Sequence, residues 1–300
     1  MKLFIEPAVD HDNIIATGLQ WLETGQRIAI ITLVNIEGNA PYPVGTQMLV
    51  AQNGDFIGQI SGGCVEHAIA EQAKNVIAEG QNVTQRYGLD SPFFDIQLPC
   101  GSGIDAYIDV VSGVAELQSI QASLQAREAA KVTLNTEVGD FEKTYLPTPR
   151  LLIVGQGSIP SHLVNLAKLA GFEVISFSPP EMAPGHLLGS NPLPNLPQQR
   201  SNLITLCDAS TALVSLFHEH HREIDILKIV LDSNLFYIGA LGSKRTHQQR
   251  LEQLSSFGLS AQVLERIQGP VGLDIGASTP QQIAISILAQ VIQALPGERD

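Results

Sequence analysis

The sequence predicts an α/β protein with two domains: an N-terminal mixed α/β domain, followed by a C-terminal domain built on a parallel sheet. The chain has 300 residues, enough for two domains of ordinary size. Hydrophobic residues make up 44% and aromatic residues only 5%, a balance typical of aliphatic strands covered by helices. Beyond residue 150, short apolar runs alternate with helical patterns, which indicates repeated β-α-β units with helices on both faces of the sheet.

Residues 1–112 form the expected N-terminal domain. Hydrophobic periodicity predicts helices at residues 13–24 and 64–79, and strands at residues 27–34, 47–51, 55–60 and 104–110. Gln52-Asn53-Gly54 favours a hairpin turn between the two middle strands, and Gly80 ends the second helix. In the last strand, apolar residues alternate with Asp and Tyr, which predicts that one face of this strand is exposed to solvent.

Residues 113–147 are expected to connect the domains, and residues 148–300 form the second domain. The connecting segment favours a helix at 114–129 and a hairpin, and it ends at Pro147-Thr148-Pro149. In the second domain, strands are expected at residues 151–154, 172–177, 203–206, 212–217 and 235–240, and helices at 161–170, 223–231, 246–256 and 280–295. The last helix has a clear start, because Thr279 and Gln282 form a T-x-x-Q capping box around Pro280.

Charge and composition exclude several classes of protein. The net charge of −13 and the scattered Lys and Arg residues argue against nucleic acid as a partner, since binding to its backbone requires a basic face. No signal-peptide core and no apolar run of membrane-spanning length are found, so no membrane is expected. The three cysteines form neither a CxxC pair nor an even framework, which favours a cytoplasmic protein with reduced thiols.

A glycine-rich loop follows the first strand of the second domain. Gly155-Gln156-Gly157-Ser158 lies between a strand and a helix, where a Rossmann-like fold places its phosphate-binding turn. Gly155, Gly157 and Ser158 are therefore candidate cofactor-binding residues, although the loop can equally serve the fold alone. Binding of NAD(P) is not favoured, because the second strand ends at Ser178 without an acidic residue for a ribose hydroxyl.

Two cysteines lie in glycine-rich loops of the first domain. Cys64 follows two glycines at the expected start of a helix, where backbone N–H groups favour a thiolate that can act as a nucleophile or bind a soft metal. Cys100 lies in a second such loop, and the two loops could face a common pocket. The alternative is that these thiols are small buried hydrophobes, as we expect for Cys207. The candidate binding residues here are Ser61, Gly62, Gly63, Cys64, Glu66, Cys100 and Gly101.

Three further loops of the second domain carry polar candidates. His218 and His220 follow a strand and could bind a metal or relay a proton, or they could simply be solvated. Gly242-Ser243-Lys244-Arg245 leads into a helix whose basic start favours a bound anion, with Ser243 as its cap. Asp274 belongs to a loop, expected to be buried, before the last helix, and it is either a ligand group or a cap.

Taken together and in order, these loops resemble the signatures of the XdhC/CoxI family. The resemblance covers roughly residues 10–110 and 145–295. Its four motifs are Gln59-Ile60-Ser61-Gly62-Gly63-Cys64-Val65-Glu66, Pro99-Cys100-Gly101-Ser102-Gly103, Tyr237-Ile238-Gly239-Ala240-Leu241-Gly242-Ser243-Lys244-Arg245, and the run from Gly269 to Pro280. Several long motifs in the same order are far more specific than a single glycine loop.

The resemblance implies a xanthine dehydrogenase accessory protein. Such a protein binds the molybdenum cofactor (molybdopterin), protects it during sulfuration and delivers it to a xanthine dehydrogenase-type enzyme, acting as a chaperone rather than a catalyst. By the resemblance, Cys64 and Cys100 contact the metal or sulfur of the cofactor. A cysteine desulfurase is a candidate further partner, and a homodimer is expected because exposed strand edges often pair. The alternative functions are an NAD(P)-dependent oxidoreductase and a thiol-redox or metal-transfer protein.

Overall fold

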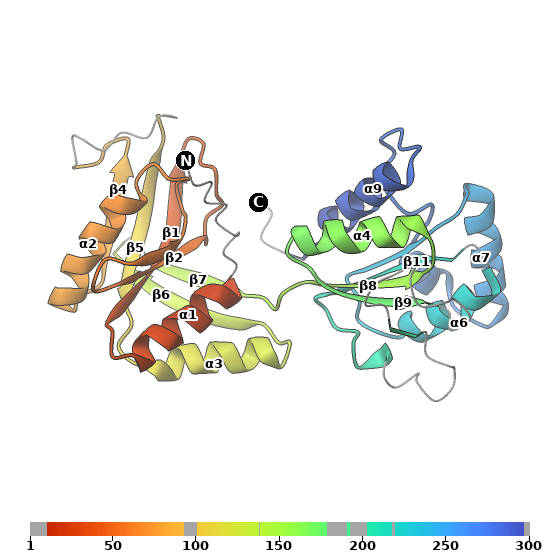
Figure 1. Ribbon diagram of the computed structural model, residues 1–300, viewed down its shortest axis with the longest axis horizontal. Helices are drawn as coiled ribbons and strands as arrows, with labels where there is room; N and C mark the ends of the chain where they lie inside the picture. Colours follow the sequence, from red (N-terminus) through yellow and green to blue (C-terminus); the bar gives the residue numbers. More distant parts are fainter. Residues whose placement is uncertain are drawn as a thin grey trace. The chain divides into compact units, whose positions relative to one another are not determined.

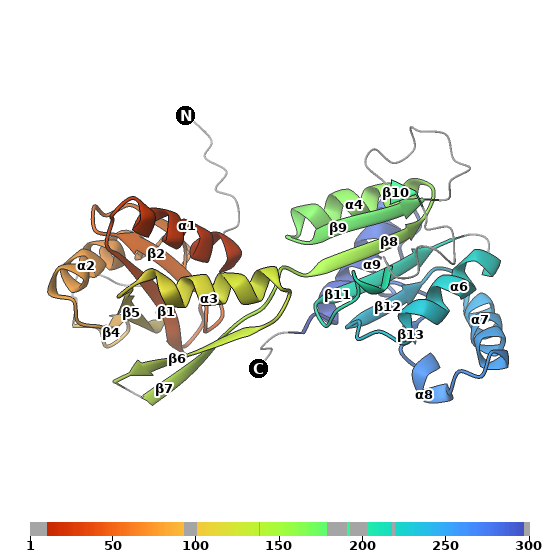
Figure 2. The same ribbon diagram turned by 90° about the horizontal axis from the view of Figure 1, so that it is seen from below.

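The computed structural model describes residues 11–92, 101–137, 139–178, 191–192, 203–217 and 220–296. The chain divides into two compact units, Met1–Pro147 and Thr148–Asp300, and we describe each by itself (Figures 1 and 2). None of the helices in these described ranges has the length and apolar character needed to cross a lipid bilayer.

The first unit is built on an antiparallel sheet of five strands in the order β3-β2-β1-β5-β4. Its strands are β1 (Ile28–Glu37), β2 (Gln47–Ala51), β3 (Phe56–Gly58), β4 (Val83–Gly88) and β5 (Gly103–Val110). The hairpin of β2 and β3 was predicted, and it is confirmed by the pairing of Met48 with Gly58. The edge strand β4 was not predicted from the sequence.

Helices cover both faces of this sheet. The helix α2 (Glu66–Glu79) packs on one face, where Ile31 and Met48 join Ile69 and Val76 in a buried cluster. The other face is covered by α1 (His11–Glu23) and α3 (Val114–Gln125), and by the hairpin of β6 (Ala130–Thr136) and β7 (Gly139–Tyr145) (Figure 1). The sheet is therefore the middle layer of the first unit.

The prediction that one face of β5 is exposed to solvent is wrong. The alternating pattern of β5 predicts a solvent-exposed face, but Tyr107 on that face is only 4% exposed. The face is covered because α3 and the β6-β7 hairpin, which follow β5 in the chain, fold back over it. On this face Tyr107 is thus buried, and Asp105 and Asp109 are partly buried rather than fully solvated.

The second unit is built on a parallel sheet of six strands in the order β10-β9-β8-β11-β12-β13. Its strands are β8 (Arg150–Gly155), β9 (Glu173–Ser178), β10 (Asn191–Pro192), β11 (Thr211–Leu216), β12 (Tyr237–Ala240) and β13 (Ile267–Gln268). In chain order this is the 3-2-1-4-5-6 arrangement of a Rossmann fold, and it confirms the predicted parallel sheet. The strand predicted at residues 203–206 is wrong, since that segment forms a helical turn whose Leu203 enters the core.

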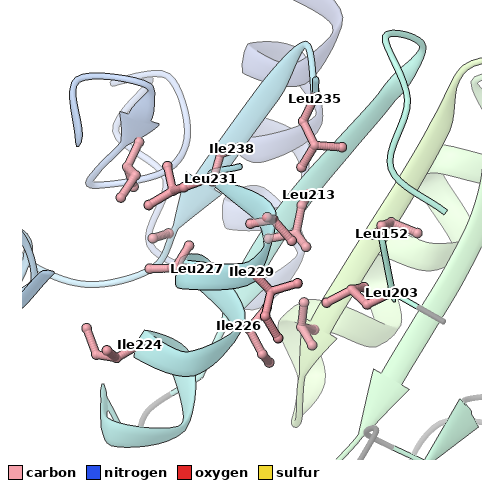
Figure 3. Close-up of a cluster of buried hydrophobic side chains, with 14 of the residues drawn as sticks. Leu152, Leu203, Leu213, Ile224, Ile226, Leu227, Ile229, Leu231, Leu235 and Ile238 are labelled. Carbon is pink, nitrogen blue, oxygen red and sulfur yellow. The ribbon is translucent and has the colours of Figure 1, made fainter. Parts of the chain in front are cut away.

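The helices of the second unit lie on both faces of its sheet, as predicted. On one face are α4 (Ser158–Leu169) and α9 (Pro280–Gln293). On the other face are α6 (His220–Val230), α7 (Lys244–Ser256) and α8 (Ala261–Leu264), and Figure 3 shows Leu227 and Ile229 of α6 near Leu213 and Ile238 of the sheet. The capping box of Thr279 and Gln282 is confirmed at the start of α9.

Candidate functional site

Three loops of the first unit leave its sheet at the same end. The strand β1 ends at Glu37, which is paired with Gly103 at the start of β5. The strand β3 ends at Gly58, next to the start of β2. The loop after β1 (residues 38–46), the Cys64 loop (residues 59–65) and the residues just before β5 therefore emerge together. The topology brings the first cysteine loop to the sheet end at which Gly101 also lies.

Contacts of the 38–46 loop link it to both of the others. The Ser102 hydroxyl donates to the Asn39 carbonyl (2.5 Å) and accepts from the Asn39 N–H (3.1 Å). The Tyr42 hydroxyl donates to Gln59 Oε1 (3.2 Å), and a Cβ on Gly62 would lie 3.2 Å from Pro41 Cγ. Gly101 lies at this end of the sheet with φ of +70°, whereas Cys100 lies outside the described residues.

Glu66 fixes the shape of the Cys64 loop. Its side chain is 3% exposed. One carboxylate oxygen accepts from the N–H groups of Ile60 (3.0 Å) and Ser61 (2.7 Å). The other accepts from the Ser61 hydroxyl (2.6 Å) and the Val65 N–H (3.2 Å). Burial raises the pKa of Glu66, but the hydrogen bonds from Ser61 and the backbone outweigh it and lower the pKa below its usual value. Glu66 therefore anchors the loop as a carboxylate and is a poor general base.

Cys64 is held on the surface beside this buried anchor. The helix α2 begins at Glu66 with Val65 as its N-cap, two residues later than the predicted start, so Cys64 precedes the helix. Gly62 and Gly63 both have positive φ, +80° and +93°, which turns the chain sharply just before the thiol. The Cys64 side chain is exposed. The first unit thus presents an accessible soft ligand on a loop of fixed shape.

The predicted glycine loop of the second unit lies where its strand order reverses. The strands β8 and β11 are neighbours, and Val154 and Gly155 at the end of β8 pair with Ser215 and Leu216 at the end of β11. In open α/β sheets, ligands bind at the carboxyl ends of the strands beside such a reversal. Gly155, with φ of +147°, lets the end of β8 lie close to the backbone of β11, because a Cβ there would lie 2.7 Å from the Leu216 carbonyl oxygen.

The helix that follows this loop has an N-terminus suited to an anion. Gly157 is its N-cap and has no side chain to accept from the first turn, which begins at Ser158 and contains no acidic residue. Backbone N–H groups at a helix start attract phosphate or carboxylate groups. A Cβ on Gly157 would meet nothing within 4 Å, so the loop is open above this residue.

The basic loop before α7 also lies at the carboxyl edge, after β12. The prediction that Ser243 caps this helix is confirmed, since its hydroxyl accepts from the Thr246 N–H (3.1 Å). Lys244 and Arg245 are exposed. A buried ion pair supports the loop, because Arg250 Nε contacts Glu223 Oε2 (2.8 Å) and Arg250 Nη2 donates to the Leu241 carbonyl (2.5 Å).

The loop after β13 is fixed at its root and exposed at its tip. The Gly272 N–H donates to Gln290 Oε1 (2.6 Å), and the Ser286 hydroxyl donates to the Leu273 carbonyl (2.7 Å). The expectation of a buried loop is wrong beyond this point, because Asp274 is exposed and Ile275 is 55% exposed. Asp274 does not cap α9, since Thr279 does, so its role as a ligand group stays a prediction.

The remaining candidates are less well defined. His218 lies outside the described residues, and His220 begins α6 with a side chain that is not described. Within the described part of the chain, no group of three or more His, Cys, Asp or Glu side chains could hold a metal ion. Cys207 packs against the core of the second unit, as expected, and burial raises the pKa of its thiol to about 11.

Both units match known protein families. Residues 151–291 match the family described as "XdhC Rossmann domain", and residues 21–88 match the "XdhC and CoxI family". The "Molybdenum cofactor insertion chaperone PaoD" of Escherichia coli (strain K12) is 32% identical in an alignment that covers 94% of this chain and 88% of that protein. A protein of Bacillus subtilis (strain 168), named as part of a probable xanthine dehydrogenase, is 27% identical over 91% of this chain and 94% of that protein.

A solved structure shares the fold. The crystal structure of a Bacillus halodurans chain, titled a xanthine dehydrogenase, matches with a TM-score of 0.73. The match covers 95% of this chain and 96% of that chain, at 23% sequence identity. Both units are therefore found in the same order in an experimentally determined structure.

Proposed function

Because the chain belongs to the XdhC and CoxI family, we propose that it binds the molybdenum cofactor and delivers it to a xanthine dehydrogenase-type enzyme. The observation that carries the proposal is the alignment with the named molybdenum cofactor insertion chaperone, which is 32% identical over 94% of this chain. The cofactor is cargo in this proposal, and the protein performs no turnover.

The exposed residues fit such a cargo. A soft thiolate is a suitable ligand for molybdenum or its sulfur, and Cys64 is exposed on a loop held by Glu66. A phosphate group fits the start of α4, because the N-cap Gly157 has open space around it and no side chain to occupy the N–H groups of the first turn. Lys244, at the start of α7, adds a positive charge at the same sheet edge. Each unit, taken by itself, therefore carries candidate groups for the cargo: a soft ligand in the first unit and an anion-binding turn in the second.

Binding without acid–base chemistry agrees with the state of Glu66. A carboxylate that already accepts four hydrogen bonds, with a lowered pKa, neither takes up nor releases a proton near neutral pH. The Cys64 loop therefore offers a ligand rather than a catalytic pair. The proposal also includes a client enzyme and a cysteine desulfurase as partners, and a homodimer as the assembly.

The test measures pterin retention by the full chain. The purified protein is incubated with molybdenum cofactor, separated from free cofactor and oxidised, and the fluorescent pterin is quantified. We expect about one pterin per chain and a several-fold loss in Cys64→Ser. The matched control is Cys207→Ser, which removes a partly buried thiol of the second unit and should retain the wild-type amount. No pterin on the wild-type protein would overturn the proposal.

A second candidate is an NAD(P)-dependent oxidoreductase, favoured by the strand order of the second unit and by the open helix start at Gly157. This candidate predicts, unlike the chaperone proposal, that NAD or NADP raises the melting temperature of the protein in a saturable way. The strand β9 ends at Ser178, which gives no carboxylate for a ribose hydroxyl. A flat titration up to millimolar nicotinamide cofactor, beside stoichiometric pterin, would reject this candidate.

A further inference from the structure

The first unit contains a cavity of about 610 Å³ that the proposed function does not use. It lies between the sheet and the layer formed by α3 and the β6-β7 hairpin, on the face opposite α2. Its volume is within the range that holds small organic ligands. The lining comes from the sheet (Ile30, Thr32, Gln47, Tyr107, Asp109), from α3 (Glu116, Leu117, Ile120) and from the hairpin (Val132, Leu134, Asn135, Tyr145), with Asn82 just before β4 and a few neighbouring residues.

The charged residues of the lining are all acidic. Asp109 and Glu116 both line the cavity, and none of the lining residues is Lys, Arg or His. Lys143 of β7 is close by, with its ammonium 5.5 Å from the centre of the Tyr145 ring, but it does not line the cavity. The cavity therefore disfavours an anion and is chemically unlike the edge of the second unit.

Asp109 is held in a defined orientation. Asn82 donates to Asp109 Oδ1 (2.6 Å) and to the Tyr107 hydroxyl (3.1 Å), while its own oxygen accepts from the Val110 N–H (2.9 Å). Burial, with the nearby charge of Glu116, raises the pKa of Asp109 to about 6. A positive charge in the cavity would relieve both effects, because it would replace lost hydration and offset the repulsion.

Gln47 supplies an independent sign of a ligand. Its side chain is 3% exposed, and its amide nitrogen donates to the Thr32 hydroxyl (2.9 Å) and the Tyr145 hydroxyl (3.0 Å). The amide oxygen is buried and has no hydrogen-bond partner among the described residues. A buried acceptor without a partner is costly and uncommon in native proteins. A donor group on a ligand in the cavity would satisfy it.

We propose that this cavity binds a small organic cation, a primary or secondary amine with an apolar body. The ammonium group would lie beside Asp109 and Glu116 and donate a hydrogen bond to Gln47 Oε1, and the body would pack on the apolar side chains of the lining, Ile30, Leu117, Ile120, Val132 and Leu134. A metal ion is a poorer occupant, since two carboxylates with an amide form a sparse ligand set beside apolar walls. The site goes beyond cargo binding and implies that an amine is a second ligand of the protein.

Three probes of one shape but different charge test the proposal on the full chain. Tryptamine is the cation, tryptophol its neutral analogue and indole-3-acetate its anion, and each is titrated by calorimetry at pH 8. We expect tryptamine to bind at least ten times more tightly than the other two. Asp109→Asn, which keeps the Asn82 hydrogen bond, should weaken tryptamine at least tenfold, and Gln47→Leu should weaken it several-fold. Equal affinities for the three probes would overturn the proposal.

A matched control separates local charge from net charge. Glu71→Gln removes one exposed negative charge from α2, on the other face of the same sheet, and should leave tryptamine affinity unchanged. A similar loss in Glu71→Gln and Asp109→Asn would show non-specific attraction and would overturn the assignment. Competition of Mg²⁺ or Ca²⁺ with tryptamine at micromolar concentration would assign the site to a metal instead. Pterin content is measured in parallel, and it should be the same in Asp109→Asn as in the wild-type protein.

Discussion

Replacing Glu66 with Gln should destabilise the first unit by an amount that depends on pH. The carboxylate accepts four hydrogen bonds while 3% exposed, three of them from backbone N–H groups. A Gln side chain keeps one oxygen for the N–H groups of Ile60 and Ser61. Its NH₂ group would face the Val65 N–H, so one acceptor is replaced by a donor. Hydrogen bonds to charged groups contribute about 1.5–3 kcal/mol each, and we expect a loss of about 2–3 kcal/mol at pH 7.

The sign of the pH dependence follows from the lowered pKa of Glu66. A carboxylate whose pKa is lower in the folded than in the unfolded chain stabilises the fold fully above the unfolded value, here 4.5. This stabilisation disappears as the pH falls through the folded value. The difference between the wild-type protein and Glu66→Gln should therefore be largest at neutral pH and shrink below about pH 4.5.

Urea unfolding followed by tryptophan fluorescence measures this difference. Trp21 is the single tryptophan of the chain and packs against the core of the first unit, so its emission reports that unit. Glu71→Gln is the control, because Glu71 is on the same helix but exposed, and its pair with Lys74 should contribute less than about 1 kcal/mol. Equal midpoints for Glu66→Gln and the wild-type protein at pH 7, or a gap that does not change down to pH 4, would refute the reasoning.

Three further substitutions have definite expected outcomes. Asp109→Asn should stabilise the ligand-free protein by about 1–2 kcal/mol at pH 8, because burial raises the pKa of Asp109 from 3.8 in the unfolded chain to about 6 in the folded one. Below pH 3.8 the carboxyl group is protonated in both states, so the substitution should leave the free energy of unfolding unchanged. The same Trp21 assay at the two pH values checks this. Gly155→Ala should destabilise the second unit by about 2–4 kcal/mol, because the added Cβ would lie 2.7 Å from the Leu216 carbonyl oxygen and the backbone φ there is +147°. Unfolding followed by circular dichroism should show a selective loss of stability in the second unit. An unchanged unfolding midpoint would contradict this prediction. Arg250→Met should cost about 3–5 kcal/mol in the same assay by breaking the buried ion pair with Glu223, and the double variant with Glu223→Leu should recover part of that loss.

Local sequence signals predicted much of the fold because the features concerned are local. The hairpin at Gln52-Asn53-Gly54, the cap at Ser243 and the capping box at Thr279 are each determined by residues within a few positions of one another. The alternation of strand and helix beyond residue 150 likewise fixed the parallel sheet, because β-α-β connections leave few other arrangements.

Long-range packing accounts for what the sequence did not predict. The strand β4 is polar at Thr84, Gln85 and Arg86, and it forms because it pairs with β5 at the sheet edge. The apolar run at 203–206 is as compatible with a buried helical turn as with a strand. The covered face of β5 depends on α3 and the hairpin, which lie later in the chain. The cavity lined by Asp109 and Gln47 could not be predicted from the sequence either, because it forms only where these later elements pack on the sheet.

The candidate sites share a division between exposed and buried residues. Cys64 and Lys244 are exposed, whereas the residues that hold their loops, Glu66 and Arg250, are buried and bonded to backbone groups. A single sequence motif can contain both kinds of residue, and the motif around Cys64 contains a candidate ligand, Cys64, and the residue that anchors its loop, Glu66. Measurements of unfolding stability distinguish the two kinds. Substitutions at Cys64 and Lys244 should lower pterin retention without changing unfolding, while those at Glu66 and Arg250 should lower both together. A variant of Cys64 that lost stability as much as pterin would mean that the exposed thiol is part of the scaffold, and the binding role would then have to be assigned to other residues.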